Sequence, residues 1–244
     1  MFSKKSVRAF TLIELLIVIA IILILIAIAL PNFLEAQERA RITKAKAVLR
    51  TNETGAMAFF TDNQFFYSDF NDPPKRKTRN RGSSVLNVPC PLNEPPPGSV
   101  RSKGGLEFIN DAGGLPGEYQ LKYNGPGLHC PLTSPVRYVE LDATREPWSD
   151  GSVSMGYDTL YFGDNSPEDI RGIRLGVYFA SGPDKITGHR EGNCPAWKGC
   201  PPCDPGKAMV FNPTNGTKSC GDLWVVVTTN TAQAKLTYNP LRTF

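Results

Sequence analysis

The chain has 244 residues, of which 41% are hydrophobic and 20% charged, and its formal net charge is +4 at pH 7. This composition is too apolar for a disordered chain, and so small a positive charge does not favour a general nucleic-acid-binding protein. The two histidines leave few candidates for acid–base catalysis. The sequence therefore indicates one or two folded domains, with the apolar residues concentrated near the N-terminus.

A basic segment and a long apolar run begin the chain. Residues 1–9 are basic, and residues 10–30 are apolar except for Thr11 and Glu14. At about 1.5 Å per residue, a helix over this run spans roughly 30 Å, which is one bilayer core. An ordinary secretory signal has a shorter apolar run that ends at a small-residue cleavage site. We expect a single membrane helix with its N-terminus in the cytoplasm and the remainder exported. The basic residues are Lys4, Lys5 and Arg8.

The helix is predicted to continue beyond the membrane. Residues 31–62 place apolar side chains at three-to-four spacing, and Glu35 and Arg39 form an i,i+4 pair. We expect one helix from about Phe10 to Asp62, with a kink or local melting at Pro31 because proline removes a backbone hydrogen bond. The apolar stripe contains Ile42, Ala45, Val48, Leu49, Ala56 and Phe59.

Glu14 is unusual because a carboxylate is costly inside an apolar run. One interpretation is an acid near the helix end that reaches the membrane surface. The other is a buried partner for a cation. Cleavage between Ala9 and Phe10 would create such a cation, an α-amine four residues before Glu14, in the same chain or in a neighbour. In the second case, Glu14 would set the register of packed helices.

Residues 8–18, Arg-Ala-Phe-Thr-Leu-Ile-Glu-Leu-Leu-Ile-Val, resemble the class III signal of type IV pilins and type II secretion pseudopilins. The resemblance implies that a prepilin peptidase removes residues 1–9 and that Phe10 is then N-methylated. It also implies that Glu14 directs subunit entry into a filament. Pro31 lies where this family has its helix-breaking proline. The family usually has glycine before the cleavage site, where this chain has Ala9.

Residues 63–244 are predicted to form an exported, β-rich globular domain. Proline and glycine cluster after Asn63, and short β-type runs separated by turn residues follow. A helix followed by separated strands favours an α+β fold, in which the exported half of the helix packs on a small antiparallel sheet with long loops. Strands are expected near residues 119–123, 136–141, 175–180, 208–211 and 223–229.

Three later segments are similar to pilin-type proteins. They are residues 132–148, the turn at 180–184, and residues 211–224. In major pseudopilins the loop between such turns binds calcium, so the resemblance implies a calcium site at Asp184, Asn215 and Asp222. Calcium requires six to eight oxygen ligands. The alternative is that these side chains only form turns, and residues 186–208 are a cysteine-rich insertion in that loop.

All six cysteines follow the apolar run. In an exported, loop-rich domain an even number indicates up to three disulfides. Cys90 and Cys130 both lie in Cys-Pro-Leu and are candidates to pair, which leaves two bridges for the other four. Alternatives are a thiol–disulfide oxidoreductase motif at residues 200–203, disfavoured by its prolines, and a four-cysteine zinc site with irregular spacing. The remaining cysteines are Cys194, Cys200, Cys203 and Cys220.

Other motifs are weaker. The basic run at 75–81 is typical of a solvated surface, and without interleaved aromatic residues it does not favour nucleic acid. Residues 151–156 miss the Gly-x-Ser-x-Gly spacing of a nucleophile elbow. His129 and His189 are isolated in predicted loops. Residues 215–217 match a glycosylation sequon.

The sequence therefore predicts a filament subunit rather than an enzyme. The expected partners are copies of itself, a prepilin peptidase, an inner-membrane assembly platform and the lipid bilayer. The subunit would begin in the inner membrane and end in a filament in the periplasm or on the cell surface, as a secretion pseudopilus or a pilus. The alternative is a single-pass anchored binding domain that never polymerises.

Overall fold

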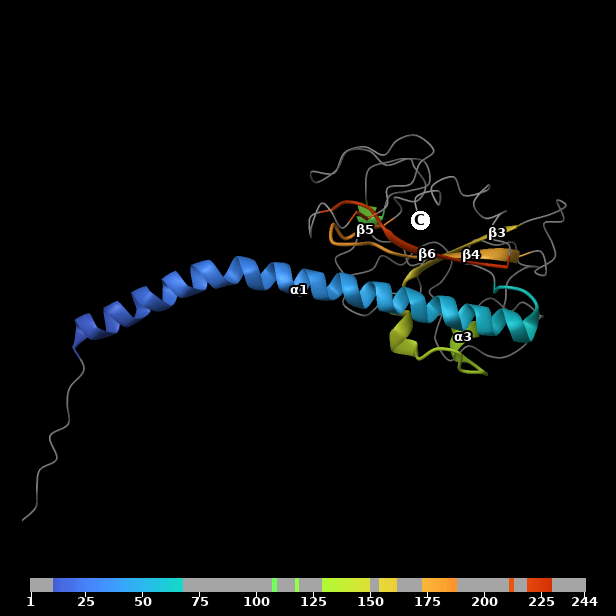
Figure 1. The fold of residues 1–244 in the computed structure, drawn as a ribbon, viewed down its shortest axis with the longest axis horizontal. Coiled ribbons are helices and arrows are strands. Elements are labelled where there is room, and N and C mark those ends of the chain that lie inside the picture. Colours follow the sequence, from blue (N-terminus) through green and yellow to red (C-terminus); the bar gives the residue numbers. More distant parts are fainter. Residues whose placement is uncertain are drawn as a thin grey trace, which may run out of the picture. The chain divides into compact units, whose positions relative to one another are not determined.

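The computed structural model describes residues 11–67, 107–108, 117–118, 129–149, 154–161, 173–187, 211–212 and 219–229. The chain divides into two compact units, residues 1–40 and 41–244. The predicted fold class is confirmed. The chain has an α+β fold with a long N-terminal helix and a small three-stranded antiparallel sheet (Figure 1).

Helix α1 runs from Leu12 to Asn63, 52 residues, and it continues unbroken through Pro31. Gln64 ends it in the left-handed region, with a φ of 66°, a conformation that frequently terminates helices. Two side chains bond the last carbonyls: Asn63 Nδ2 donates to Phe59 O at 2.9 Å, and Gln64 Nε2 donates to Thr61 O at 2.9 Å. The bond to Thr61 O replaces a backbone partner that a carbonyl at a helix end lacks.

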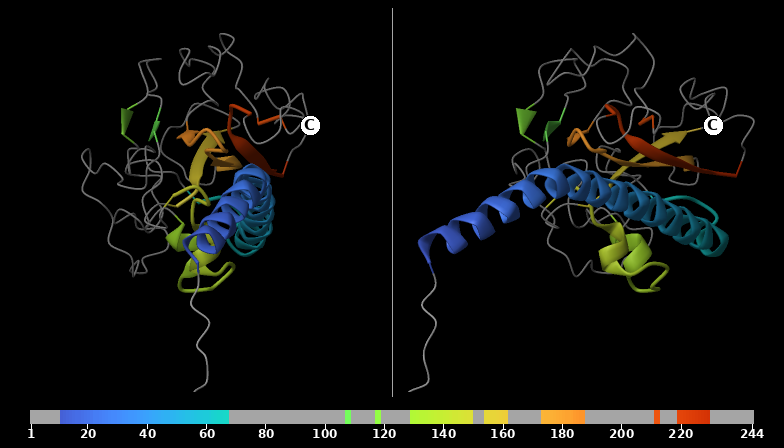
Figure 2. Two further views of the ribbon diagram at one scale, coloured as in Figure 1. Left: turned by 90° about the vertical axis from the view of Figure 1, so that its left-hand side faces the viewer. Right: turned by 60° about the vertical axis from the view of Figure 1, so that its left-hand side comes forward.

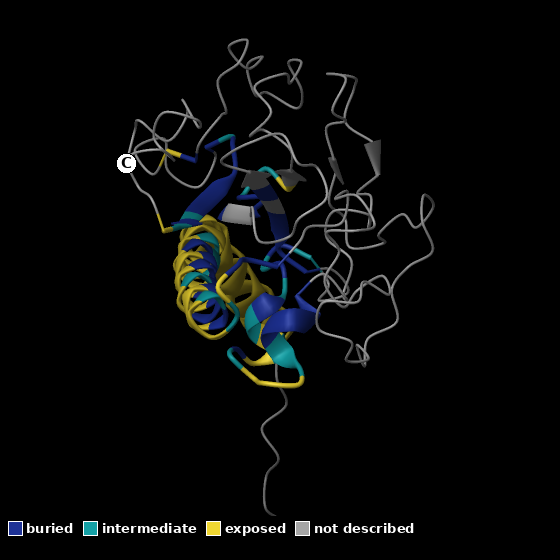
Figure 3. Ribbon diagram, turned by 90° about the vertical axis from the view of Figure 1, so that its right-hand side faces the viewer, coloured by how far each residue is buried: buried dark blue, intermediate teal, exposed yellow. Residues whose placement is uncertain are grey.

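The predicted apolar stripe is the buried face of α1. All six of its residues are buried, together with Asn52 and Gly55. Figure 3 shows buried residues on one side of this half of the helix and exposed residues on the other. The second half of α1 lies between the sheet and the segment that contains α3 (Cys130–Thr133), as Figure 2 shows.

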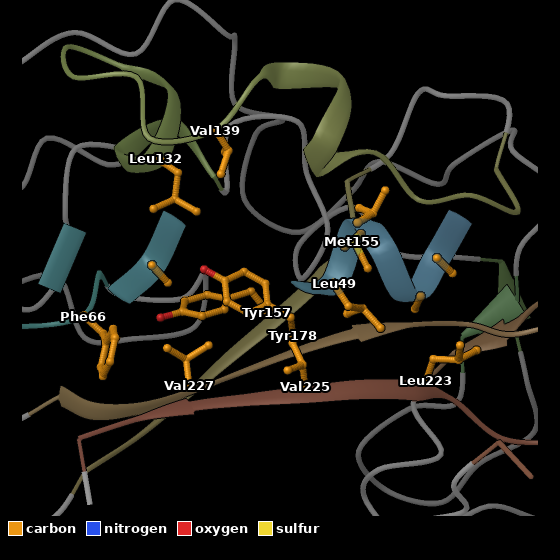
Figure 4. Close-up of a cluster of buried hydrophobic side chains, with 14 of the residues drawn as sticks. Leu49, Phe66, Leu132, Val139, Met155, Tyr157, Tyr178, Leu223, Val225 and Val227 are labelled. Atoms are coloured by element: carbon orange, nitrogen blue, oxygen red, sulfur yellow. The ribbon is translucent and has the colours of Figure 1, made fainter. Parts of the chain in front are cut away.

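The larger sheet has the strand order β3–β4–β6, and both pairs are antiparallel. Strands β4 (Ile173–Ala180) and β6 (Leu223–Thr228) confirm two predicted strands, whereas β3 (Gly156–Tyr161) was not predicted. Tyr178 pairs with Tyr157 on one side and Val225 on the other. Leu223, Val225 and Val227 point from β6 toward α1 (Figure 4). Residues 175, 177 and 179 of β4 are buried as well as residues 176, 178 and 180, so this strand is covered on both faces.

A second sheet contains three two-residue strands. β1 (Glu107–Phe108) pairs antiparallel with β2 (Gly117–Glu118) and parallel with β5 (Ile186–Thr187). Residues 119–123 and 208–210 of the predicted strands lie outside the described residues, and Phe211 is not in a strand.

The predicted strand at residues 136–141 is wrong. The chain there forms bends and then a 3₁₀ helix, η3 (Leu141–Thr144). Both Tyr138 N and Val139 N donate to Leu132 O, at 2.8 and 3.1 Å. The backbone donors are therefore used within a compact turn instead of a strand ladder, while Val139 is buried against α1.

Candidate assembly site

The first part of α1 is an apolar surface. Glu14 is the only ionisable residue between Leu12 and Leu34, and the large apolar side chains in this range are between 45% and 82% exposed. Among the described helices, α1 is the one long and apolar enough to cross a membrane. Such a surface requires either lipid or other protein around it.

Glu14 forms a capping box with Thr11 at the start of α1. Thr11 N and Thr11 Oγ1 both donate to Glu14 Oε2, at 2.9 and 2.8 Å, and Glu14 N donates to Thr11 Oγ1 at 3.3 Å. Each residue thus satisfies the other's backbone N–H, as expected of Thr-x-x-Glu at a helix start. The Thr11–Glu14 spacing carried this signal, but the sequence interpretation considered only membrane-surface and cation-partner roles for Glu14.

The capping box leaves part of the Glu14 carboxylate available. All its hydrogen bonds within the described residues end on Oε2, so Oε1 can face a second donor. Ala9 and Phe10 lie outside the described residues, and the pairing of Glu14 with an amine stays a prediction.

Pro31 is inside α1. Proline has no backbone N–H, so the Ala27 carbonyl cannot accept its usual i+4 hydrogen bond. The helix is nevertheless continuous at this position, without local melting. The predicted kink stays a prediction.

The described part of the predicted calcium site forms a turn. Asp184 Oδ2 accepts a hydrogen bond from Gly221 N at 3.0 Å, and Asp222 is fully buried. Asn215 lies outside the described residues. Among the described residues there is no group of three or more His, Cys, Asp or Glu side chains that could hold a metal ion. Calcium also binds carbonyl and amide oxygens, and calcium binding stays a prediction.

A buried carboxyl group that the sequence did not reveal joins two predicted turn regions. Glu146 is 3% exposed. Its Oε1 accepts hydrogen bonds from Trp148 N and Ser181 Oγ, both at 3.3 Å, and its Oε2 accepts one from Ser181 N at 3.4 Å. Burial, and to a smaller extent the nearby charge of Asp222, raise the pKa of Glu146 to about 8. These bonds hold the segment at 146–148 against the turn at 181–184.

Cys130 and Cys220 are both in disulfide bonds. Cys130 begins α3, and Cys220 lies three residues before β6. The other four cysteines, and with them the predicted pairing of Cys90 with Cys130, lie outside the described residues. So do the basic run at 75–81, His189 and the sequon at 215–217.

The segment that resembles a nucleophile elbow, residues 151–156, ends at the start of a strand. Within residues 151–156, Ser154 forms an isolated β-bridge with Arg145, and Gly156 begins β3. His129, predicted to be an unremarkable loop residue, is instead a buried member of a hydrogen-bonded cluster of aromatic residues.

A known protein family matches the same N-terminal segment. Residues 4–30 match the family model described as the prokaryotic N-terminal methylation motif. The chain is 51% identical over 63 residues to the type IV major pilin protein PilA of Myxococcus xanthus. The chain is therefore similar to a type IV pilin over part of its length. The match covers 26% of this chain and 28% of the Myxococcus pilin.

A second relative is the type IV wide pilus major component PilA4 of Thermus thermophilus. The identity is 43% over 65 residues, which is 27% of this chain and 50% of that protein. The chain thus matches half or less of the length of these curated relatives. No solved structure gives a significant match.

Proposed function

We propose that this protein is a structural subunit of a type IV pilus-like filament and that it polymerises through α1. The observation that carries this proposal is the exposed apolar surface of residues 12–34, interrupted only by Glu14, in a chain that is similar to two pilus components. An exposed surface of this kind can be covered by lipid before assembly and by other subunits after it.

Processing would occur on the N-terminal side of the capping box. A prepilin peptidase would cleave between Ala9 and Phe10, and Phe10 would then be N-methylated, as the methylation motif over residues 4–30 supports. Thr11 would become the second residue of the mature chain, so both of its donors to Glu14 would be retained. Cleavage also removes three basic residues that would otherwise hold the N-terminus in the cytoplasm.

The proposed assembly depends on two different interactions. Lipid chains are as apolar as the leucine and isoleucine side chains of α1, so transfer from bilayer to filament gains little from the hydrophobic effect, and close packing must supply the attraction. Packing of similar apolar side chains does not define one register. The α-amine of a neighbouring Phe10, paired with Glu14, would select it, because an unpaired charge in an apolar environment is costly.

The names of the relatives favour a pilus. Both are described as type IV pilus proteins. The resemblance of the later turns to major pseudopilins favours a type II secretion pseudopilus slightly, and the two relatives outweigh it. The alternative function is that of a single-pass anchored extracytoplasmic binding domain that stays monomeric. It would retain Met1 and would not form filaments.

The first test is N-terminal analysis of the protein from sheared surface filaments and from membranes. We expect a mature chain beginning with methylated Phe10 in the filaments. An intact Met1 in a protein that is monomeric in detergent would instead support the anchored domain.

The second test separates charge pairing from helix capping. Glu14→Gln removes the charge and retains a side chain of the same shape, and we expect it to abolish filaments without loss of membrane insertion. Thr11→Val removes the hydroxyl but retains the backbone donor to Glu14, and we expect filaments at a reduced yield. Glu35→Gln, at an exposed pair with Arg39, is the matched control. Normal filaments from Glu14→Gln would contradict the proposed role of the charge.

A further inference from the structure

A chain of four hydrogen-bonded groups runs through the core of the globular unit. Tyr67 Oη lies 2.6 Å from Tyr178 Oη and 2.7 Å from His129 Nδ1, and His129 Nε2 lies 2.9 Å from Met155 O. His129 is 1% exposed, and both tyrosines are fully buried. Figure 4 shows Tyr178 beside Tyr157, with both rings between α1 and the sheet.

The direction of every proton in this chain follows from the last acceptor. A carbonyl oxygen can only accept, so His129 Nε2 must carry the proton that it donates to Met155 O. In the neutral imidazole Nδ1 is then an acceptor, and Tyr67 must donate to it. The single hydroxyl proton of Tyr67 is thereby used, so Tyr178 must donate to Tyr67. With a neutral histidine, every proton in this chain of bonds therefore has an acceptor.

This chain holds the segment that follows α1. Tyr67 ends residues 64–67, in which the chain leaves the helix. Its ring stacks on Tyr157 with centroids 4.3 Å apart, and Tyr157 Oη donates to the Tyr67 carbonyl at 3.0 Å. Tyr67 therefore connects the end of α1 to β3, to β4 and to His129 immediately before α3.

Protonation of His129 opposes this arrangement. A proton on Nδ1 would point at a hydroxyl that already donates in its direction. Tyr67 could reverse its proton only toward Tyr178, which has no other acceptor within the described residues. The groups that face the imidazole are the rings of Tyr67, Tyr157 and Tyr178 and the Met155 carbonyl. No carboxylate is among these contacts, so an imidazolium there would lack a counter-ion.

We propose that the Tyr178–Tyr67–His129 chain is an acid-sensitive lock, which holds residues 64–67 in the core while His129 is neutral and releases them when it is protonated. Burial supports this direction, because it lowers the pKa of His129 to about 4. In the released state, in which His129 is solvated and titrates near 6.5, the imidazole binds the proton more tightly. Acid therefore favours release, independently of the proposed assembly of the chain.

The test is hydrogen exchange of the full chain in detergent micelles at pH 7 and pH 4.5, corrected for intrinsic exchange rates. We expect the protection of amides in residues 60–67 to fall by roughly 60-fold, from the linkage of one proton to opening. Protection of β6 should fall much less, because β6 does not contact His129 in this chain of bonds. An equal loss in both segments would show global unfolding and overturn the lock.

The matched variant is His129→Gln, whose amide can donate to Met155 O and accept from Tyr67 but cannot be protonated in this pH range. We expect it to abolish most of the acid-induced loss in residues 60–67. The same loss as in the wild type would overturn the proposal. Should this variant fail to fold, NMR titration of the imidazole in a His189→Gln chain gives an independent test. Release of the segment while His129 remains neutral would equally overturn the lock.

Discussion

Val139 lies so close to Gly55 of α1 that a Cβ at position 55 would overlap its Cγ1 atom. Glycine is unfavourable by about 1 kcal/mol relative to alanine inside a helix, so its presence here permits this close approach. It places the turn at residues 138–139 directly on the helix.

Gly55→Ala is therefore expected to destabilise the globular unit, despite the better helix propensity of alanine. Overpacking of a buried site typically costs about 1–3 kcal/mol, and the β-branched Val139 cannot easily move. Chemical denaturation of the single variants and of Gly55→Ala combined with Val139→Ala measures the coupling. The double variant should be more stable than the sum of the single effects predicts. If the effects of Gly55→Ala and Val139→Ala on the free energy of unfolding simply add, the steric overlap between the two side chains is contradicted.

Asn52 is a fully buried amide on the apolar face of α1. Its Nδ2 donates to Val48 O at 2.8 Å and to Ala143 O at 2.6 Å, while its Oδ1 is buried without a hydrogen-bond partner. Asn52→Asp would replace this donor by an acceptor or a charge facing two carbonyls. We expect a loss of about 2–4 kcal/mol in the free energy of unfolding, larger than the loss from Asn52→Ala. A larger loss from Asn52→Ala than from Asn52→Asp would contradict the role of the Asn52 amide as a donor.

Because of Glu146, we expect the free energy of unfolding to fall as pH rises. Its pKa is about 8 in the folded protein and about 4.5 when unfolded, so folding favours the protonated form. The stabilisation is complete below pH 4.5 and is lost progressively up to about pH 8, at about 1.4 kcal/mol for each unit of pKa difference. Glu146→Gln cannot titrate and should give a flatter dependence between pH 5 and 8. Denaturation curves over this range measure it, and an unchanged slope in the variant would contradict the assignment.

Asp222→Asn provides a separate control for that pH dependence. Removal of the neighbouring charge should lower the pKa of Glu146, because the Asp222 charge raises it. The midpoint of the stability loss should therefore shift to lower pH. An upward shift would be inconsistent with two like charges in proximity.

Calcium binding, implied by resemblance, can be tested by chelation. If calcium is bound near Asp184 and Asp222, EDTA should lower the melting temperature, and added calcium should restore it by mass action. The turn bond from Gly221 N to Asp184 Oδ2 can form without metal. Asp184→Asn should retain an acceptor for that bond while weakening a cation site. An identical melting temperature with and without EDTA would remove the calcium hypothesis.

The predictable parts of the fold were those with regular patterns. The apolar run and the stripe from Ile42 to Phe59 predicted α1 almost to its end, because the helical repeat is visible in consecutive residues. The β-branched residues 225–227 similarly predicted β6. Strand β3 was missed because Gly156 and Asp158 interrupt its pattern. Residues 136–141 contain the β-prone Val136, Tyr138 and Val139, but they fold as a turn whose donors bond Leu132.

The buried polar sites could not be predicted, since their partners are distant in the chain. Asn52 bonds a carbonyl 91 residues away, Tyr67 bonds a histidine 62 residues away, and Glu146 bonds a serine 35 residues away. Only folding brings these groups together. The capping box differs, because Thr11 and Glu14 are three residues apart and the sequence alone contained its signal.

The protonated carboxyl of Glu146 also affects calorimetry. At pH 7 the folded domain carries a proton on this group that the unfolded chain does not retain, so melting releases it to the solvent. The buffer takes up that proton with its own heat. The apparent enthalpy of melting should therefore differ between phosphate and Tris at equal pH, and Glu146→Gln should remove most of the difference.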